Sequence, residues 1–290
     1  MIFHQALNAL QLGSIYALIA LGYTMVYGVL RLINFAHGDV FMIGSYAALF
    51  LASYFHAPFV VVVPLTFAAI ALLGVCIERL AYRPLRSAPR VSAVITALAI
   101  GLFLETITLA VAGPEPRKFP ALVGDRLIAF GGFAASNVQV LIIGASVVLM
   151  AALELFVAKT RTGMAMRALS WDTIAAPLLG INIDAIVSFT FAIGTGLAAV
   201  AGIFVGLAYP VIDPYMGIVV GWKAFVSAVI GGIGSIKGAV AGGFILGIVE
   251  IVSAAFLPSS YKDMIVFGLL LVILLFRPAG LFGMPVNKKV

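Results

Sequence analysis

Long apolar runs follow one another along almost the whole chain, each separated from the next by a few polar, Gly or Pro residues. A helix needs about 20 apolar residues to cross the hydrocarbon core of a bilayer, and Pro and Gly mark the borders of helices. The sequence therefore predicts a single all-α domain over 1–290, a polytopic membrane helical bundle of about 8–10 transmembrane helices. Nine segments can be delimited: 6–30, 39–55, 59–77, 91–112, 138–158, 185–208, 217–234, 238–257 and 264–276.

The composition agrees with a membrane protein and excludes most other classes. Hydrophobic residues make up 63% of the chain and charged residues 10%, against about 45–50% and about 25% in soluble domains. Soluble globular, disordered and nucleic-acid-binding proteins are thereby excluded. Cys76 is the single cysteine and lies in an apolar run, so we expect no disulfide framework and no cysteine metal cluster. We also expect no other metal site and no cofactor bound by this chain.

The distribution of Lys and Arg predicts an orientation, because these residues favour cytoplasmic loops. If the N-terminus lies outside and every segment crosses, the C-terminus is cytoplasmic and twelve cations lie inside against four outside. Segment 217–234 is short and glycine-rich, so it either spans or re-enters. The inside cations are Arg31, Arg79, Arg83, Arg86, Arg90, Lys159, Arg161, Arg167, Lys237, Arg277, Lys288 and Lys289, and the outside ones are Arg117, Lys118, Arg126 and Lys262.

Two connecting loops exceed 20 residues. In the extracytoplasmic loop 113–137, the patch Leu127–Phe130 suggests a small hairpin. The cytoplasmic loop 159–184 carries an apolar stripe at i, i+4 and i+7, with Ser170 as a candidate N-cap and Gly180 as a C-cap. We expect a short amphipathic helix over about 171–179. Such a helix either lies on the lipid headgroups or docks on a cytoplasmic protein. The stripe consists of Ile174, Leu178 and Ile181.

Motifs in this loop and elsewhere resemble those of a known protein family. The loop reads Gly163-Met-Ala-Met-Arg167-Ala168, then Asp172, Ala175-Ala176 and Leu179-Gly180-Ile181. It resembles the coupling loop of ABC importer permeases, and more narrowly the branched-chain amino acid permease family. Four further stretches resemble that family: Leu7–Leu18, Arg31–Asp39, Glu78–Arg86 and Gly231–Ala239. Tyr261-Lys-Asp263 also matches, so the resemblance covers nearly the whole chain. Pro177 departs from the helix former expected there.

The resemblance implies a transport subunit rather than an enzyme, in a bacterial plasma (inner) membrane. It implies import of branched-chain or other hydrophobic amino acids, with ATP and Mg²⁺ held by two cytoplasmic ATPase subunits. The chain agrees, since it has no Gly-x-x-x-x-Gly-Lys-Ser/Thr phosphate loop. A second permease subunit, paralogous or identical, and an extracytoplasmic binding protein complete the implied complex. The residues implied in ATPase coupling are Gly163, Arg167, Ala168, Asp172, Ala176, Leu179, Gly180 and Ile181.

Polar residues inside apolar segments are candidates for the translocation pathway or its gate. Asn34, His37 and Asp39 interrupt two apolar runs. They form either a structural or gating turn near the inside surface, which we favour because of Arg31, or a discontinuous helix facing the pathway. Glu105 and Glu250 lie within apolar runs, where a carboxylate costs about 2.5–3.5 kcal/mol on insertion scales. They either line the path for a substrate ammonium group or form helix–helix hydrogen bonds.

Small residues four positions apart predict close helix packing in the segment 238–257. The packing is either within the chain or at a dimer interface. The residues are Gly238, Gly242, Gly243 and Gly247.

Other functions stay open at this stage. An ion-coupled secondary transporter or channel would use Glu105 and Glu250 and need no ATPase, but it gives loop 159–184 no evident role. An ABC permease for urea or short amides, or a purely structural membrane subunit, also fits the composition.

Overall fold

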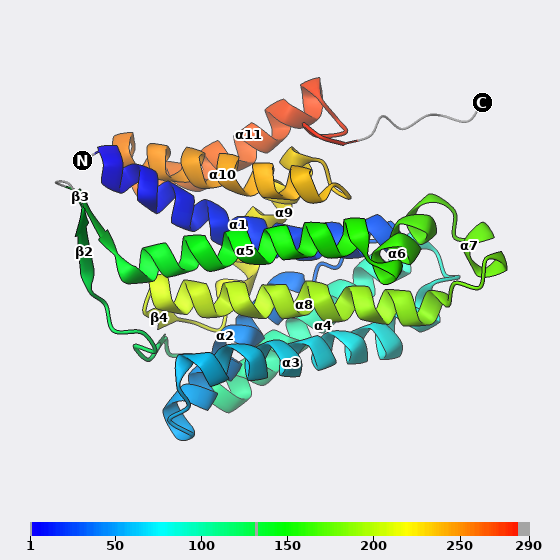
Figure 1. The fold of residues 1–290 in the computed structure, drawn as a ribbon, viewed down its shortest axis with the longest axis horizontal. Coiled ribbons are helices and arrows are strands. Elements are labelled where there is room, and N and C mark those ends of the chain that lie inside the picture. Colours follow the sequence, from blue (N-terminus) through cyan, green and yellow to red (C-terminus); the bar gives the residue numbers. More distant parts are fainter. Residues whose placement is uncertain (1, 131–132, 284–290) are drawn as a thin grey trace.

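The fold is known from a computed structural model, which describes residues 2–130 and 133–283 (Figure 1). The predicted all-α membrane bundle is confirmed, since helices dominate the described chain and sheet is limited to two short pairs. The helices are α1 (Ile2–Leu30), α2 (His37–Tyr54), α3 (Phe59–Ile77), η1 (Glu78–Tyr82), η2 (Arg83–Leu85), α4 (Arg90–Ala112), α5 (Asn137–Lys159), α6 (Arg161–Trp171), α7 (Ala175–Leu178), α8 (Ile183–Ala208), α9 (Met216–Gly231), α10 (Ile236–Phe256), η3 (Ser259–Tyr261) and α11 (Lys262–Phe276). The strands are β1 (Arg117–Lys118), β2 (Leu127–Phe130), β3 (Phe133–Ser136) and β4 (Val211–Ile212).

Each of the nine predicted segments coincides with a helix. Six of these helices, α1, α3, α4, α5, α8 and α10, are long and apolar enough to cross a membrane. The other three are shorter, with 18 residues in α2, 16 in α9 and 15 in α11. At about 1.5 Å per residue, α9 and α11 are shorter than the roughly 30 Å hydrocarbon core.

Helices α1 and α8 form the centre of the bundle. In their most apolar stretches 89% and 78% of the residues are buried, against 28% or less in α3, α4 and α5. The outer helices therefore expose continuous apolar faces, as expected where hydrocarbon is the solvent. Figure 1 shows α5 and α8 on the near side of the bundle, with α4 and α9 behind them.

Short strands mark one end of the bundle, which we call the hairpin end. The hairpin expected at Leu127–Phe130 is confirmed, since β2 pairs antiparallel with β3. Strand β1 pairs with β4, so the loop after α4 is joined to the segment after α8. Ser136 caps α5 by accepting a hydrogen bond from the backbone N–H of Val138.

The opposite end of the bundle, which we call the basic end, carries α6 and α7 (Figure 1). Two contacts join the elements at this end: the guanidinium of Arg31 donates to the carbonyl of Ser170 in α6, 3.2 Å away, and Lys237 of α10 pairs with Glu154 of α5 at 3.4 Å. Ten of the twelve cations assigned to the inside belong to elements that meet at this end. Lys288 and Lys289 fall outside the described residues.

The four glycines of α10 lie in close contacts within the chain. Gly243 and Gly247 face α1, where an added Cβ would lie 2.5 Å from backbone atoms of Ala17 and Gly13. Gly238 and Gly242 face the end of α9, against carbonyl oxygens of Gly231 and Ser227. Two pairs of small residues thus let α10 approach two neighbouring helices at backbone distance.

The helix expected over 171–179 is wrong at its start. Helix α6 continues to Trp171, and the hydroxyl of Ser170 donates back to the carbonyl of Arg167, so Ser170 is no N-cap. Asp172 accepts hydrogen bonds from the N–H groups of Ile174 and Ala175 instead. The helix that follows, α7, has only four residues.

Candidate translocation site and coupling loop

The chain turns back into the bundle between α1 and α2. Helix α1 is followed directly by Arg31, whose φ of +54° is left-handed although the residue is not Gly. Residues 31–36, which we call the return segment, then lead back alongside α1, and Asn34 is buried. Helix α2 starts at His37, whose ring lies 4.7 Å from the ring of Tyr23. Because Tyr23 lies seven residues before the end of α1, α2 begins about 10 Å inside that end.

This placement differs from the turn that we favoured. Arg31 does lie at the basic end, but His37 is fully buried and Asp39 is 8% exposed. The segment therefore corresponds to the discontinuous arrangement, in which a helix begins at depth with its polar residues inside protein. Irregular backbone is tolerated at such depth only where protein or a cavity surrounds it.

The first turns of α2 and α9 meet at this depth. An added Cβ on Gly38 would lie 2.8 Å from the Cα of Gly221, and one on Gly217 would lie 2.8 Å from the carbonyl oxygen of Gly38. Only glycine permits this approach. Tyr23 completes the junction by donating its hydroxyl to the carbonyl of Gly221 at 3.3 Å.

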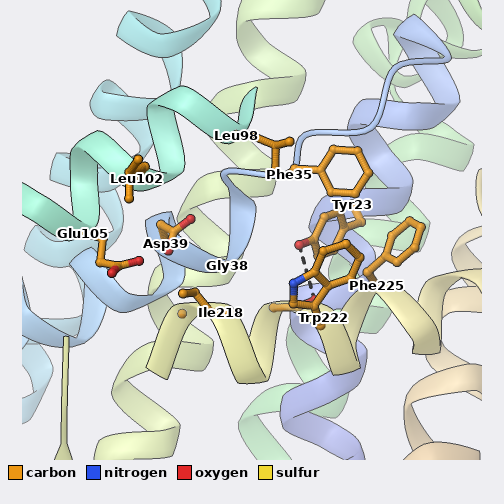
Figure 2. Close-up of a pocket in the computed structure, with 12 residues that line it drawn as sticks. Tyr23, Phe35, Gly38, Asp39, Leu98, Leu102, Glu105, Ile218, Trp222 and Phe225 are labelled. Carbon is orange, nitrogen blue, oxygen red and sulfur yellow. Dashed lines mark hydrogen bonds between the residues drawn. The ribbon is translucent and has the colours of Figure 1, made fainter. Parts of the chain in front are cut away.

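A cavity of about 220 Å³ lies beside this junction. Figure 2 shows Asp39 of α2 and Glu105 of α4 with their carboxylates on the same side of it. The rest of the lining is mainly aromatic and aliphatic: Tyr23, Phe35, Leu98, Leu102, Ile218, Trp222 and Phe225, with Gly38, Gly217 and Gly221.

The two carboxylates carry no ion pair within the described part of the chain. Oδ1 of Asp39 is buried without a hydrogen-bond partner among the described residues, and Oδ2 packs against Gly101 of α4. Glu105 is 9% exposed. Burying a carboxylate without a partner costs free energy unless a ligand supplies a cation or hydrogen-bond donors. Carboxylates beside aromatic rings suit an ammonium group.

Glu250 is not brought to this cavity. Its Oε1 lies 2.9 Å from the ammonium of Lys223 in α9, and its Oε2 accepts a hydrogen bond from the hydroxyl of Tyr16 at 2.6 Å. Lys223 also pairs with Asp263 of α11 at 2.8 Å. The cluster therefore joins α1, α9, α10 and α11. Of the two roles considered for Glu250, its position corresponds to a contact between helices rather than to the lining of the cavity. The sequence analysis did not identify Lys223 as its partner.

The coupling-loop residues lie at the basic end. Gly163 packs against the backbone of Val157, and the guanidinium of Arg167 donates to the carbonyls of Val157 and Ala158 at 2.7 and 3.0 Å. Ala176 is buried, whereas Ile174, Leu178 and Leu179 are more than three-quarters exposed. Gly180, two residues after α7, has φ +77°, and Ala168 and Ile181 lie within the same loop.

Pro177 fits this short helix. As the third residue of α7 it lies in the first turn, where backbone N–H groups have no intrahelical partner. The missing N–H therefore removes no helical hydrogen bond.

A polar network connects the coupling loop with the return segment. Asp184, at the start of α8, pairs with Arg86 at 2.6 Å and also with Arg83. Arg86 in turn pairs with the fully buried Glu78. In the same π-helical turn η1, the hydroxyl of Tyr82 donates to Oδ1 of Asn34 at 3.0 Å. The network thus reaches from the first turn of α8, where loop 159–184 ends, to the residues before α2.

The chain is similar to known proteins over nearly its whole length. The family model described as "Branched-chain amino acid transport system / permease component" matches residues 5–275. The chain is 42% identical to the high-affinity branched-chain amino acid transport system permease protein BraD of Pseudomonas aeruginosa, over 99% of this chain and 97% of that one. It is 43% identical to the corresponding LivH of Escherichia coli with the same coverage.

A more distant relative is the probable branched-chain amino acid transport permease protein LivH of Methanocaldococcus jannaschii, 29% identical over 97% of this chain. No solved structure matches. The family model and the full-length relatives agree with the motifs and with the helical bundle. The chain belongs to the permease family of branched-chain amino acid transport systems.

Proposed function

We propose that this chain is one permease subunit of an ATP-driven importer of branched-chain amino acids, and that Asp39 and Glu105 receive the ammonium group of the substrate. The observation that carries the proposal is the cavity at the α2–α9 junction. It holds two carboxylates without cationic partners in the described chain, beside Leu98, Leu102 and Phe35, which offer apolar surface to an aliphatic side chain.

The partners that we propose are the other subunits of such an importer. Two cytoplasmic ATPases dock on loop 159–184, where the exposed residues Ile174, Leu178 and Leu179 offer an apolar contact. A second permease subunit and an extracytoplasmic binding protein complete the importer. ATP and Mg²⁺ belong to the ATPases, and the substrate is selected mainly by the binding protein.

The orientation we propose places the hairpin end outside and the basic end in the cytoplasm of a bacterial inner membrane. The cations of the described chain support it, since those of the basic end outnumber those of the hairpin end ten to four. Loop 159–184 then faces the cytoplasm, where the ATPases reside, and the hairpin end faces the compartment of the binding protein.

The test is uptake of radiolabelled leucine by cells that express the whole importer with Glu105→Gln or Asp39→Asn. Losing a charge-assisted hydrogen bond costs about 1.5–3 kcal/mol, so uptake falls about 10-fold or more. The matched control is Glu154→Gln, an acid at the basic end whose contact with Lys237 is solvent-exposed; its uptake stays near wild type.

Wild-type uptake in both cavity variants would reject the proposed substrate site. The ion-coupled alternative is tested in the same cells by removing the ATPase subunits. Uptake that persists without them and collapses with an uncoupler would reject the ATP-driven mechanism.

A further inference from the structure

The connection between α3 and α4 concentrates positive charge at the basic end of the bundle. Between Asp39 and Glu105 the sequence has a single acidic residue, Glu78. Four arginines follow it within the next twelve residues: Arg79, Arg83, Arg86 and Arg90. We call residues 78–91 the arginine turn. Its excess of positive charge has to be balanced by other parts of the chain or by a ligand.

Two of the four arginines are neutralised inside the protein. Arg86 pairs with the fully buried Glu78 and, at 2.6 Å, with Asp184 of α8. Arg83 also pairs with Asp184. Both acidic residues that the described chain brings to the arginine turn are therefore already engaged.

The other two arginines, Arg79 and Arg90, are exposed and have no ion pair within the described residues. Arg79 lies in the π-helical turn η1, and Arg90 is the first residue of α4. Only residues 83–89 separate η1 from α4, and the two elements are in contact. Two unpaired guanidinium groups are thus carried by neighbouring elements.

An exposed apolar residue follows each of these two arginines. Leu80 is 80% exposed and Val91 is 67% exposed. Exposed apolar side chains continue from here along both helices, with Leu72 on α3 and Ile95 on α4. Figure 1 shows α3 along the lower edge of the bundle. Because such outer faces meet hydrocarbon, the arginine turn lies where the hydrocarbon core gives way to the lipid headgroups.

We propose that the arginine turn binds an anionic phospholipid. Its phosphate lies against Arg79 and Arg90, since a guanidinium group binds phosphate oxygens through parallel hydrogen bonds. Its acyl chains lie along Leu80 and Val91. A soluble phosphate would engage the two arginines but leave the apolar residues uncovered, whereas a lipid satisfies both. The site is separate from the cavity at Asp39 and goes beyond the transport function proposed above.

An occupied lipid site would also steady the polar network of the basic end. Arg79 shares η1 with Glu78 and Tyr82, which contact Arg86 and Asn34. A lipid that holds Arg79 therefore holds the turn through which the network reaches the return segment. Since a ligand of the folded state stabilises it, we expect anionic lipid to raise the melting temperature of the complex.

The test measures lipid binding to the purified, complete importer by native mass spectrometry. The probe is phosphatidylglycerol, and zwitterionic phosphatidylcholine is the comparison. The double variant Arg79→Gln/Arg90→Gln is expected to bind phosphatidylglycerol about 25-fold more weakly, because each basic residue near the headgroups contributes about five-fold. The matched control is Arg277→Gln, which removes an exposed arginine after α11 that has no ion pair in the described chain. Its affinity for phosphatidylglycerol should be unchanged.

Two further measurements separate a lipid site from other occupants. Phosphatidylglycerol should raise the melting temperature of the wild-type complex but not that of the double variant. Glycerol 3-phosphate, which carries the phosphate without acyl chains, should not displace the lipid.

Photoactivatable phosphatidylglycerol tests the site in the wild-type complex, so the result does not depend on a variant that assembles. Adducts within residues 79–95 should be suppressed by excess phosphatidylglycerol but not by phosphatidylcholine. Adducts at Val148 of α5, which is 66% exposed, should respond equally to both lipids.

Four results would overturn the proposal: equal binding of the two lipids by the wild-type complex, equal losses in the double variant and in Arg277→Gln, displacement by glycerol 3-phosphate, or adducts within residues 79–95 that both lipids suppress equally.

Discussion

At the scale of single residues, the site depends on positions where no side chain can be added. Gly101 of α4 packs directly against Oδ2 of Asp39. In Gly101→Ala the new methyl group would displace that carboxylate, because overpacking forces neighbours off their positions at about 1–3 kcal/mol. We expect leucine uptake to fall about 10-fold while the protein still inserts in the membrane.

The control for this prediction is another helical glycine in the same chain. Gly144 of α5 has nothing within 4 Å of an added Cβ, so Gly144→Ala leaves uptake unchanged. Equal uptake in both alanine variants would show that the position of the Asp39 carboxylate does not matter for transport.

A single hydrogen bond joins the return segment to the polar network of the basic end. Tyr82→Phe removes the hydroxyl that donates to Asn34, a loss of about 1 kcal/mol. We expect uptake to fall several-fold while the ATPase activity of the complex persists, since the network links loop and site. A parallel decrease of ATPase activity and uptake, with lower thermal stability, would indicate a structural contact only.

At the scale of elements, a buried ion pair joins Lys223 of α9 to Glu250 of α10, and Lys223 also pairs with the more exposed Asp263 of α11. Lys223→Met leaves Glu250 without its closest cation, and Glu250→Gln leaves Lys223 with Asp263 alone. Breaking a buried pair from one side costs about 3–5 kcal/mol, whereas replacing both partners is often neutral. We expect each single variant to lower the melting temperature of the purified complex and the double variant to recover most of it.

The contrast with an exposed pair sharpens this prediction. Lys237→Met breaks the solvent-exposed pair with Glu154 at 3.4 Å and should barely change the melting temperature. If the double variant at Lys223 and Glu250 is as unstable as the sum of the two single variants, the ion pair is not what joins α9 to α10.

Elements were predictable from the sequence where the signal is local. Helix borders followed Pro and Gly, and segment 59–77 coincides with α3 to the residue. The helix predicted in loop 159–184 started at the wrong residue, because Ser170 and the apolar stripe after it resemble a helix start. In the structure α6 continues through Ser170. Asn34, Asp39, Glu105 and Glu250 were candidates from the sequence, but the tyrosines that contact two of them were not. Tyr82 meets Asn34 across 48 positions, and Tyr16 meets Glu250 across 234. Only packing brings such residues together.

At the scale of the whole molecule, the charge difference between the two ends predicts the orientation. Single cysteines in a Cys76→Ala background can test it with a membrane-impermeant maleimide. Lys118→Cys lies in β1 at the hairpin end, and Trp171→Cys replaces a residue at the basic end that is 78% exposed. Because cations favour the cytoplasmic side, we expect Lys118→Cys to react in cells with a permeabilised outer membrane. Trp171→Cys should react only after lysis, and the reverse pattern would place the coupling loop outside, beyond the reach of any ATPase.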